Sequence, residues 1–111
     1  MQTMQLDFKS LTKKIETIAK EFFASKSKIN SKGGILDPSL IDDDDPSAKY
    51  IEKVNTAYRS LNEAEQTIIN NDFFYQGYPM WWKYSYKRST YYRHKNIAMA
   101  HFLEAFENEL L

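Results

Sequence analysis

Apolar side chains recur at the 3.6-residue period of an α-helix, and this spacing is the feature that most limits the fold. Leu11, Ile15, Ile18 and Phe22 follow one another at intervals of four, three and four residues. Such a series forms one stripe along a helix. The 111 residues include only three Gly and three Pro, and β-branched residues rarely alternate with polar ones. We therefore expect an all-α fold, a small helical domain without a sheet.

The chain divides into three segments by composition. We expect an N-terminal amphipathic helix in residues 1–26, because the polar run from Ser25 leads into the flexible pair Gly33 and Gly34. A polar and acidic linker is expected in 27–45, either mobile or with a short ordered piece around 35–41. Residues 46–111 form the helical domain. The apolar stripe of the first helix either forms part of the core or forms the contact surface of a homodimer.

Helix-capping residues mark where the next two helices begin. Asp45 precedes Pro46, and an N-cap carboxylate followed by Pro is a strong helix start. Asn62 with Glu65 three residues later has the spacing of a capping box, so a third helix is expected over 63–71. The apolar stripe of the second helix is expected to comprise Ile51, Val54, Tyr58 and Leu61, and the third helix would bury Ile68 and Ile69.

The C-terminal part is rich in aromatic residues. Gly77 and Pro79 break the chain, and a short helix is expected over 80–84. Adjacent Trp81 and Trp82 diverge by about 100° on a helix, so we expect one to pack under the last helix and the other to lie near the surface. The aromatic segment 73–82 either belongs to the core or forms a surface that binds a partner. The last helix should run from residue 87 or 88 to 109, with Tyr91, Ala98, Phe102 and Phe106 facing inward.

Charge is balanced overall, with 15 basic and 15 acidic side chains, but it is unevenly distributed. Residues 41–72 carry three bases and eight acids, whereas residues 73–103 carry five bases and no acid. Ten of the 17 aromatic residues also lie between positions 73 and 92. Because a phosphate responds to the local field, this acid-free stretch is a candidate nucleic-acid-binding face despite the zero net charge.

Part of the chain resembles region four of bacterial sigma factors, and more closely the ArpU-type late transcriptional regulators of phages. The resemblance rests on residues 61–69, 84–93, 98–99 and 102–103. Its central phrase reads Lys87-Arg88-Ser89-Thr90-Tyr91-Tyr92-Arg93, similar to the Ser-x-Ser-Thr-Tyr-Tyr-Arg that opens the recognition helix in the phage regulators. Where the family has a Ser or Thr that caps the recognition helix, this sequence has Lys87. Where the family has the Gly of the turn, it has Ser85. The resemblance implies a C-terminal helix-turn-helix and a DNA-binding transcriptional regulator or sigma-like accessory factor.

If the last helix enters a major groove, the side chains of its first turns reach the DNA. Two Arg would contact base edges, and the Lys residues would contact phosphates. The expected DNA-binding residues are Lys83, Lys87, Arg88, Ser89, Thr90, Tyr92, Arg93 and Lys95. The partners expected are double-stranded DNA, RNA polymerase and a second copy of the chain. The alternative is a helical protein-interaction module that keeps the fold without reading DNA.

Several other classes of function are not expected. The chain has no Cys, no Gly-rich phosphate loop and no Gly-x-Ser-x-Gly elbow, so we expect no enzymatic activity. His94 and His101 lie about 10 Å apart on one helical face, and the acidic run 42–45 lacks the spacing of a calcium loop, so neither a metal nor a cofactor is expected. With no long apolar run and no signal-like start, the expected location is the cytoplasm, away from membranes.

Overall fold

The computed structural model describes residues 8–31, 45–75 and 78–108, and all of its regular elements within these ranges are helical. The elements are α1 (Phe8–Ser31), α2 (Pro46–Arg59), α3 (Glu63–Ile69), a π-helical turn η2 (Asn70–Phe74), a 3-10 turn η3 (Trp81–Tyr84) and α4 (Arg88–Asn108). The expectation of an all-α fold is therefore confirmed for this part of the chain. Most of the expected linker, at 32–44, and the Gly77 break lie outside the described residues.

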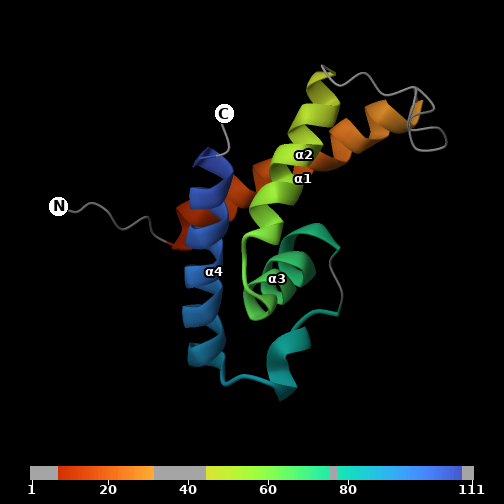
Figure 1. The fold of residues 1–111 in the computed structure, drawn as a ribbon. Helices are drawn as coiled ribbons and strands as arrows, with labels where there is room; N and C mark the ends of the chain where they lie inside the picture. Colours follow the sequence, from red (N-terminus) through yellow and green to blue (C-terminus); the bar gives the residue numbers. More distant parts are fainter. Residues whose placement is uncertain (1–7, 32–44, 76–77, 109–111) are drawn as a thin grey trace.

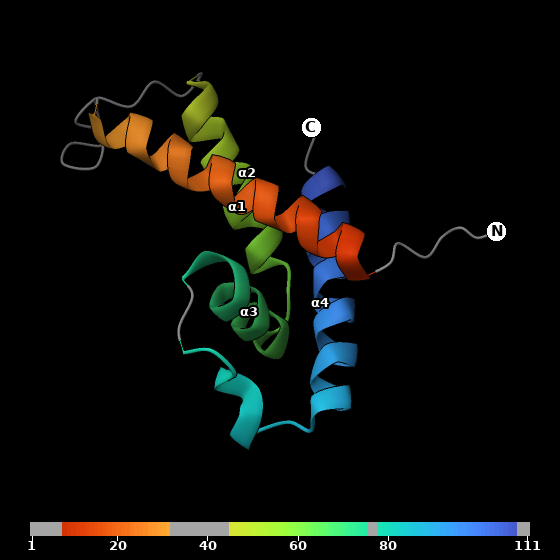
Figure 2. The same cartoon turned by 180° about the vertical axis from the view of Figure 1, so that it is seen from behind.

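Helix α1 crosses both α2 and α4 at one end of the molecule (Figure 1). The view from behind shows α3 below α2, and η3 leading into the start of α4 at the opposite end (Figure 2). Helix α4 also packs against α2 and α3. No helix among the described residues combines the length and the apolar character that crossing a membrane requires.

Helix α1 is longer than the sequence predicted. We expected it to end near Ser25, but it continues to Ser31. Ser25 lies three residues after Phe22, and Ile29 lies four residues after Ser25, so both continue the buried stripe of the helix. They are 1% and 5% exposed. Burial of this face of α1 outweighs the low helix propensity of the polar run.

The predicted starts of α2 and α3 are confirmed. The Asp45 carboxylate accepts a 2.8 Å hydrogen bond from the Ser47 amide, and Pro46 opens α2. The Asn62 side chain accepts from the Glu65 amide at 2.8 Å, and the Glu65 carboxylate accepts from the Asn62 amide at 3.1 Å. Each helix therefore begins with a local side chain that accepts a hydrogen bond from one of its first free amides.

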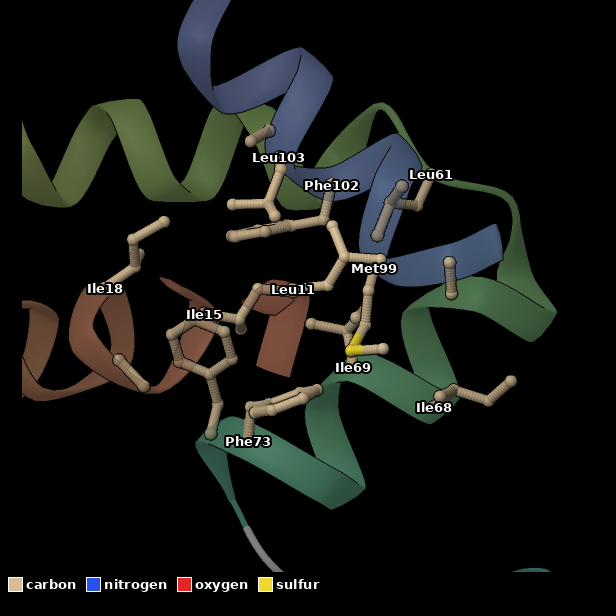
Figure 3. Packing of buried hydrophobic residues seen from close by; sticks show 14 of the residues in the cluster. Leu11, Ile15, Ile18, Leu61, Ile68, Ile69, Phe73, Met99, Phe102 and Leu103 are labelled. Carbon is tan, nitrogen blue, oxygen red and sulfur yellow. The ribbon is translucent and has the colours of Figure 1, made fainter. Parts of the chain in front are cut away.

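One core joins all four α-helices. Leu11, Ile15 and Ile18 of α1 face Met99, Phe102 and Leu103 of α4, while Ile69 and Phe73 close the core from below (Figure 3). Fully burying a side chain of this size contributes about 1.5–3 kcal/mol. The α1 stripe therefore belongs to the core of its own chain, so a homodimer would have to use another surface.

Candidate nucleic-acid interface

The beginning of α4 is anchored by Tyr91, which is 2% exposed as the sequence predicted. The Trp82 ring stacks on it at a centroid distance of 4.3 Å, and the Trp81 ring meets it edge-on at 5.9 Å. As predicted, the two Trp side chains differ in burial: Trp82 packs under α4 and is buried, whereas Trp81 is half-buried. Both contact the same tyrosine from the 3-10 turn η3.

A polar cluster under α4 centres on the Asp72 carboxylate of η2. It accepts a 2.8 Å hydrogen bond from the Trp81 indole nitrogen and a second hydrogen bond from the Tyr91 hydroxyl. The Lys95 ammonium pairs with it at 3.2 Å. Burial, followed by the Asp72 hydrogen bond and charge, raises the pKa of Tyr91 well above its ordinary value. The cluster thereby connects η2, η3 and α4, and it fixes the direction in which α4 leaves η3.

Lys95 is held inside this cluster. Only 15% of its side chain is exposed, and its ammonium lies within 6 Å of the ring centroids of Phe8, Phe73 and Tyr91. We had expected Lys95 to contact phosphates. The structure instead gives it an internal partner, Asp72, although Lys95 and the exposed Arg88 line the same cavity.

The remaining cations of this region face solvent. Lys83, Lys87, Arg88 and Arg93 are exposed, and no carboxylate within the ranges 8–31, 45–75 and 78–108 forms an ion pair with any of them. Ser89 is also exposed, whereas Thr90 is half-buried. Seven of the eight residues predicted for DNA contact thus lie at the surface or its edge, on η3, on the following turn and on the first two turns of α4.

Tyr92 forms a base under Arg88. The Arg88 guanidinium lies 6.0 Å from the centre of the Tyr92 ring, which in turn packs edge-on against Phe8 and Trp82. Contact with a fixed ring limits the number of orientations that the guanidinium adopts. Beside these residues lies an open cavity of about 340 Å³, lined partly by Asp72, Arg88 and Tyr92.

No family model, no curated protein and no solved structure matches this chain.

In the aromatic segment 73–82, some side chains belong to the core and others are exposed, so both roles considered from the sequence are represented. Phe73, Phe74 and Trp82 are buried in the core, whereas Tyr75, Tyr78 and Met80 are 55%, 85% and 53% exposed. Tyr84, between two exposed lysines, is 95% exposed. The exposure of Tyr84 was not predicted, although its position between Lys83 and Lys87 is a signal in the sequence that could have indicated it.

The two histidines serve separate contacts. The His94 ring lies 5.5 Å from that of Tyr86, and the His101 imidazole pairs with the Glu65 carboxylate. Within the part of the chain that the structure describes, no group of three or more His, Cys, Asp or Glu side chains is close enough to hold a metal ion.

Proposed function

We propose that the chain binds duplex DNA by placing the N-terminal half of α4 in the major groove. The observation that carries the proposal is the exposure of Arg88, Arg93, Lys83 and Lys87, without an ion pair to any described carboxylate, at the start of one anchored helix. The acidic residue that precedes this stretch of the chain, Asp72, pairs with Lys95. Exposed cations with no internal partner are the groups that phosphates attract.

The proposed roles follow from position. Arg88, Ser89, Tyr92 and Arg93 reach base edges, and Arg can bind guanine through two parallel hydrogen bonds. Lys83 and Lys87 contact the phosphates on either side and set the register. The positive end of the α4 dipole lies at the same place and favours phosphate further.

The wider proposal is a transcriptional regulator or a sigma-like accessory factor. It includes a helix-turn-helix in which η3 and α4 take the parts of the supporting and recognition elements, as the resemblance to region four implies. The support is the phrase at 87–93 together with the inward position of Tyr91 and the outward positions of Arg88 and Arg93. RNA polymerase is a proposed partner, and the cytoplasm is the proposed location.

Salt-dependent binding to a mixed-sequence duplex tests the proposal, with fluorescence anisotropy as the measurement. We expect affinity to fall as salt rises, with a slope of about 0.9 per phosphate contact in a log–log plot. Arg88→Ala and Arg93→Ala should weaken binding, each losing about 1–3 kcal/mol of discrimination if it reads a base. Arg59→Ala is the matched control, because Arg59 is exposed on α2 and pairs with Glu52.

A slope near zero, or binding by both Arg variants equal to that of the parent, would contradict DNA reading by α4. The second candidate function would then be favoured, a protein-interaction module that uses the exposed side chains of Tyr75, Tyr78, Met80 and Tyr84. A Tyr84→Ala variant distinguishes the two further. Loss of a protein partner with unchanged DNA affinity would assign Tyr84 to the second candidate.

A further inference from the structure

A second cavity lies between α1, α2 and η2, and it shares no lining residue with the candidate interface. Its volume is about 220 Å³. Phe22, Ile51, Val54 and Phe74 provide apolar walls. An apolar protein cavity of about 150 Å³ holds a benzene molecule. The space between α1 and α2 therefore accommodates a phenyl ring or a short alkyl chain.

One cation, Lys26, borders this apolar space. Its ammonium donates a 3.1 Å hydrogen bond to the Tyr75 hydroxyl and lies 5.3 Å from the centre of the Phe22 ring. No carboxylate in the described ranges pairs with it. An ammonium whose contacts within the described ranges are aromatic rings and a hydroxyl is a favourable site for an anion.

Two carboxamides complete the polar lining. Asn55 of α2 and Asn70 of η2 both line the cavity and are half-buried. Neither side chain forms a hydrogen bond with another residue of the described ranges. A mainly apolar pocket with a few polar groups around it is the usual form of a small-molecule site.

We propose that this cavity binds a small amphipathic monocarboxylate, with its phenyl or alkyl body against the walls formed by Phe22, Ile51 and Phe74 and its carboxylate beside Lys26. A monoanion matches the single ammonium, whereas a phosphate monoester would bring nearly two charges against one. Asn55 and Asn70 can donate to the carboxylate oxygens that Lys26 leaves unoccupied.

The position of the cavity connects it with α4. Asn70 and Phe74 belong to the same π-helical turn as Asp72, which holds Tyr91 and Lys95. Such turns occur frequently at functional sites. A ligand that contacts η2 therefore contacts the segment that fixes the start of α4. The binding proposal itself does not depend on DNA binding.

Nuclear magnetic resonance of the ¹⁵N-labelled full chain tests the proposal directly, because side-chain amides give separate signals. Titration with 3-phenylpropionate should produce saturable shifts of the Asn55 and Asn70 side-chain signals. The neutral 3-phenylpropionamide has nearly the same shape and should bind about tenfold more weakly, which corresponds to about 1.4 kcal/mol.

A pair of matched variants isolates the charge. Lys26→Met keeps the apolar stem and should reduce carboxylate affinity about tenfold while leaving amide affinity unchanged. Lys53→Met is the control, because the Lys53 ammonium lies 4.2 Å from the Phe106 ring and outside this cavity. It should bind the carboxylate as the parent does.

Three results would overturn the proposal. One is the absence of saturable shifts at millimolar ligand, and another is equal binding of carboxylate and amide by the parent. The third concerns the source of the carboxylate. If an acetylated peptide ending in Phe shifts the same signals at far lower concentration than 3-phenylpropionate, the site belongs to a peptide terminus and not to a small molecule.

Discussion

Replacing Asp72 by Ala should strongly destabilise the fold. The substitution removes the acceptor for the Trp81 indole and the Tyr91 hydroxyl, and it leaves the Lys95 ammonium without its counter-charge. The side chains of Asp72 and Lys95 are only 13% and 15% exposed. Water therefore has limited access to the groups that lose their partner.

The expected cost is a large share of the total stability. Removing one member of a buried ion pair costs about 3–5 kcal/mol. We take about 3 kcal/mol here, because a small part of each side chain still reaches solvent. A domain of this size has about 5–15 kcal/mol of total stability.

Urea unfolding followed by far-ultraviolet circular dichroism measures the effect without depending on the two Trp side chains beside Asp72. Glu52→Ala is the matched control. It removes an acid from another ion pair, with Arg59, whose side chains are 69% and 62% exposed. Such exposed pairs contribute about 0–1 kcal/mol, so the control should unfold close to the parent midpoint.

The double variant Asp72→Ala with Lys95→Met separates the charge from the hydrogen bonds. Removing the orphaned ammonium should recover part of the loss, giving a coupling energy of about 1–3 kcal/mol. If Asp72→Ala costs less than about 1 kcal/mol, or if the two substitutions are additive, the cluster does not hold α4 as argued.

Three further predictions concern stability. Asp45→Ala should lower the free energy of unfolding by about 1 kcal/mol through loss of the α2 cap, and an unchanged melting temperature would show that another group holds this helix start. Tyr91→Ala should cost about 3–5 kcal/mol, and thermal unfolding checks it. Because the pKa of Tyr91 is raised above 10.0 in the folded state, its hydroxyl contributes fully below about pH 10 and the contribution is lost as the pH rises further. Unfolding free energies should therefore fall above about pH 10 in the parent and less steeply in Tyr91→Phe; parallel curves would contradict this.

Local signals in the sequence were sufficient for the helix starts. The caps at Asp45 and Asn62 depend on neighbours two and three residues away, so their spacing alone predicts them. The stripe from Leu11 to Phe22 and the inward position of Tyr91 likewise follow from the helical period. The extension of α1 through Ile29 could not be predicted from this period, because it depends on tertiary burial that overrides the low helix propensity of the polar run.

The candidate interface shows the same division between local and distant causes. The exposure of Arg88 and Arg93 follows from the helical wheel once Tyr91 is placed inside. The pairing of Lys95 with Asp72 could not be predicted from the helical wheel. Asp72 lies 23 residues earlier in the chain, and the π-helical turn η2 places it beside Lys95. The cavity beside Lys26 could not be predicted from the sequence either, because its walls come from three separate elements.

The crossing of α1 over α4 has a consequence for synthesis on the ribosome. The Thr12 hydroxyl donates to the Met99 sulfur, and these residues are 87 positions apart. At about 5–20 residues per second, roughly 4–17 s separate the translation of the two residues. During that interval the side of α1 that packs against α4 has no partner from its own chain. We therefore expect this side of the nascent helix to be a surface that a ribosome-associated chaperone contacts during that interval.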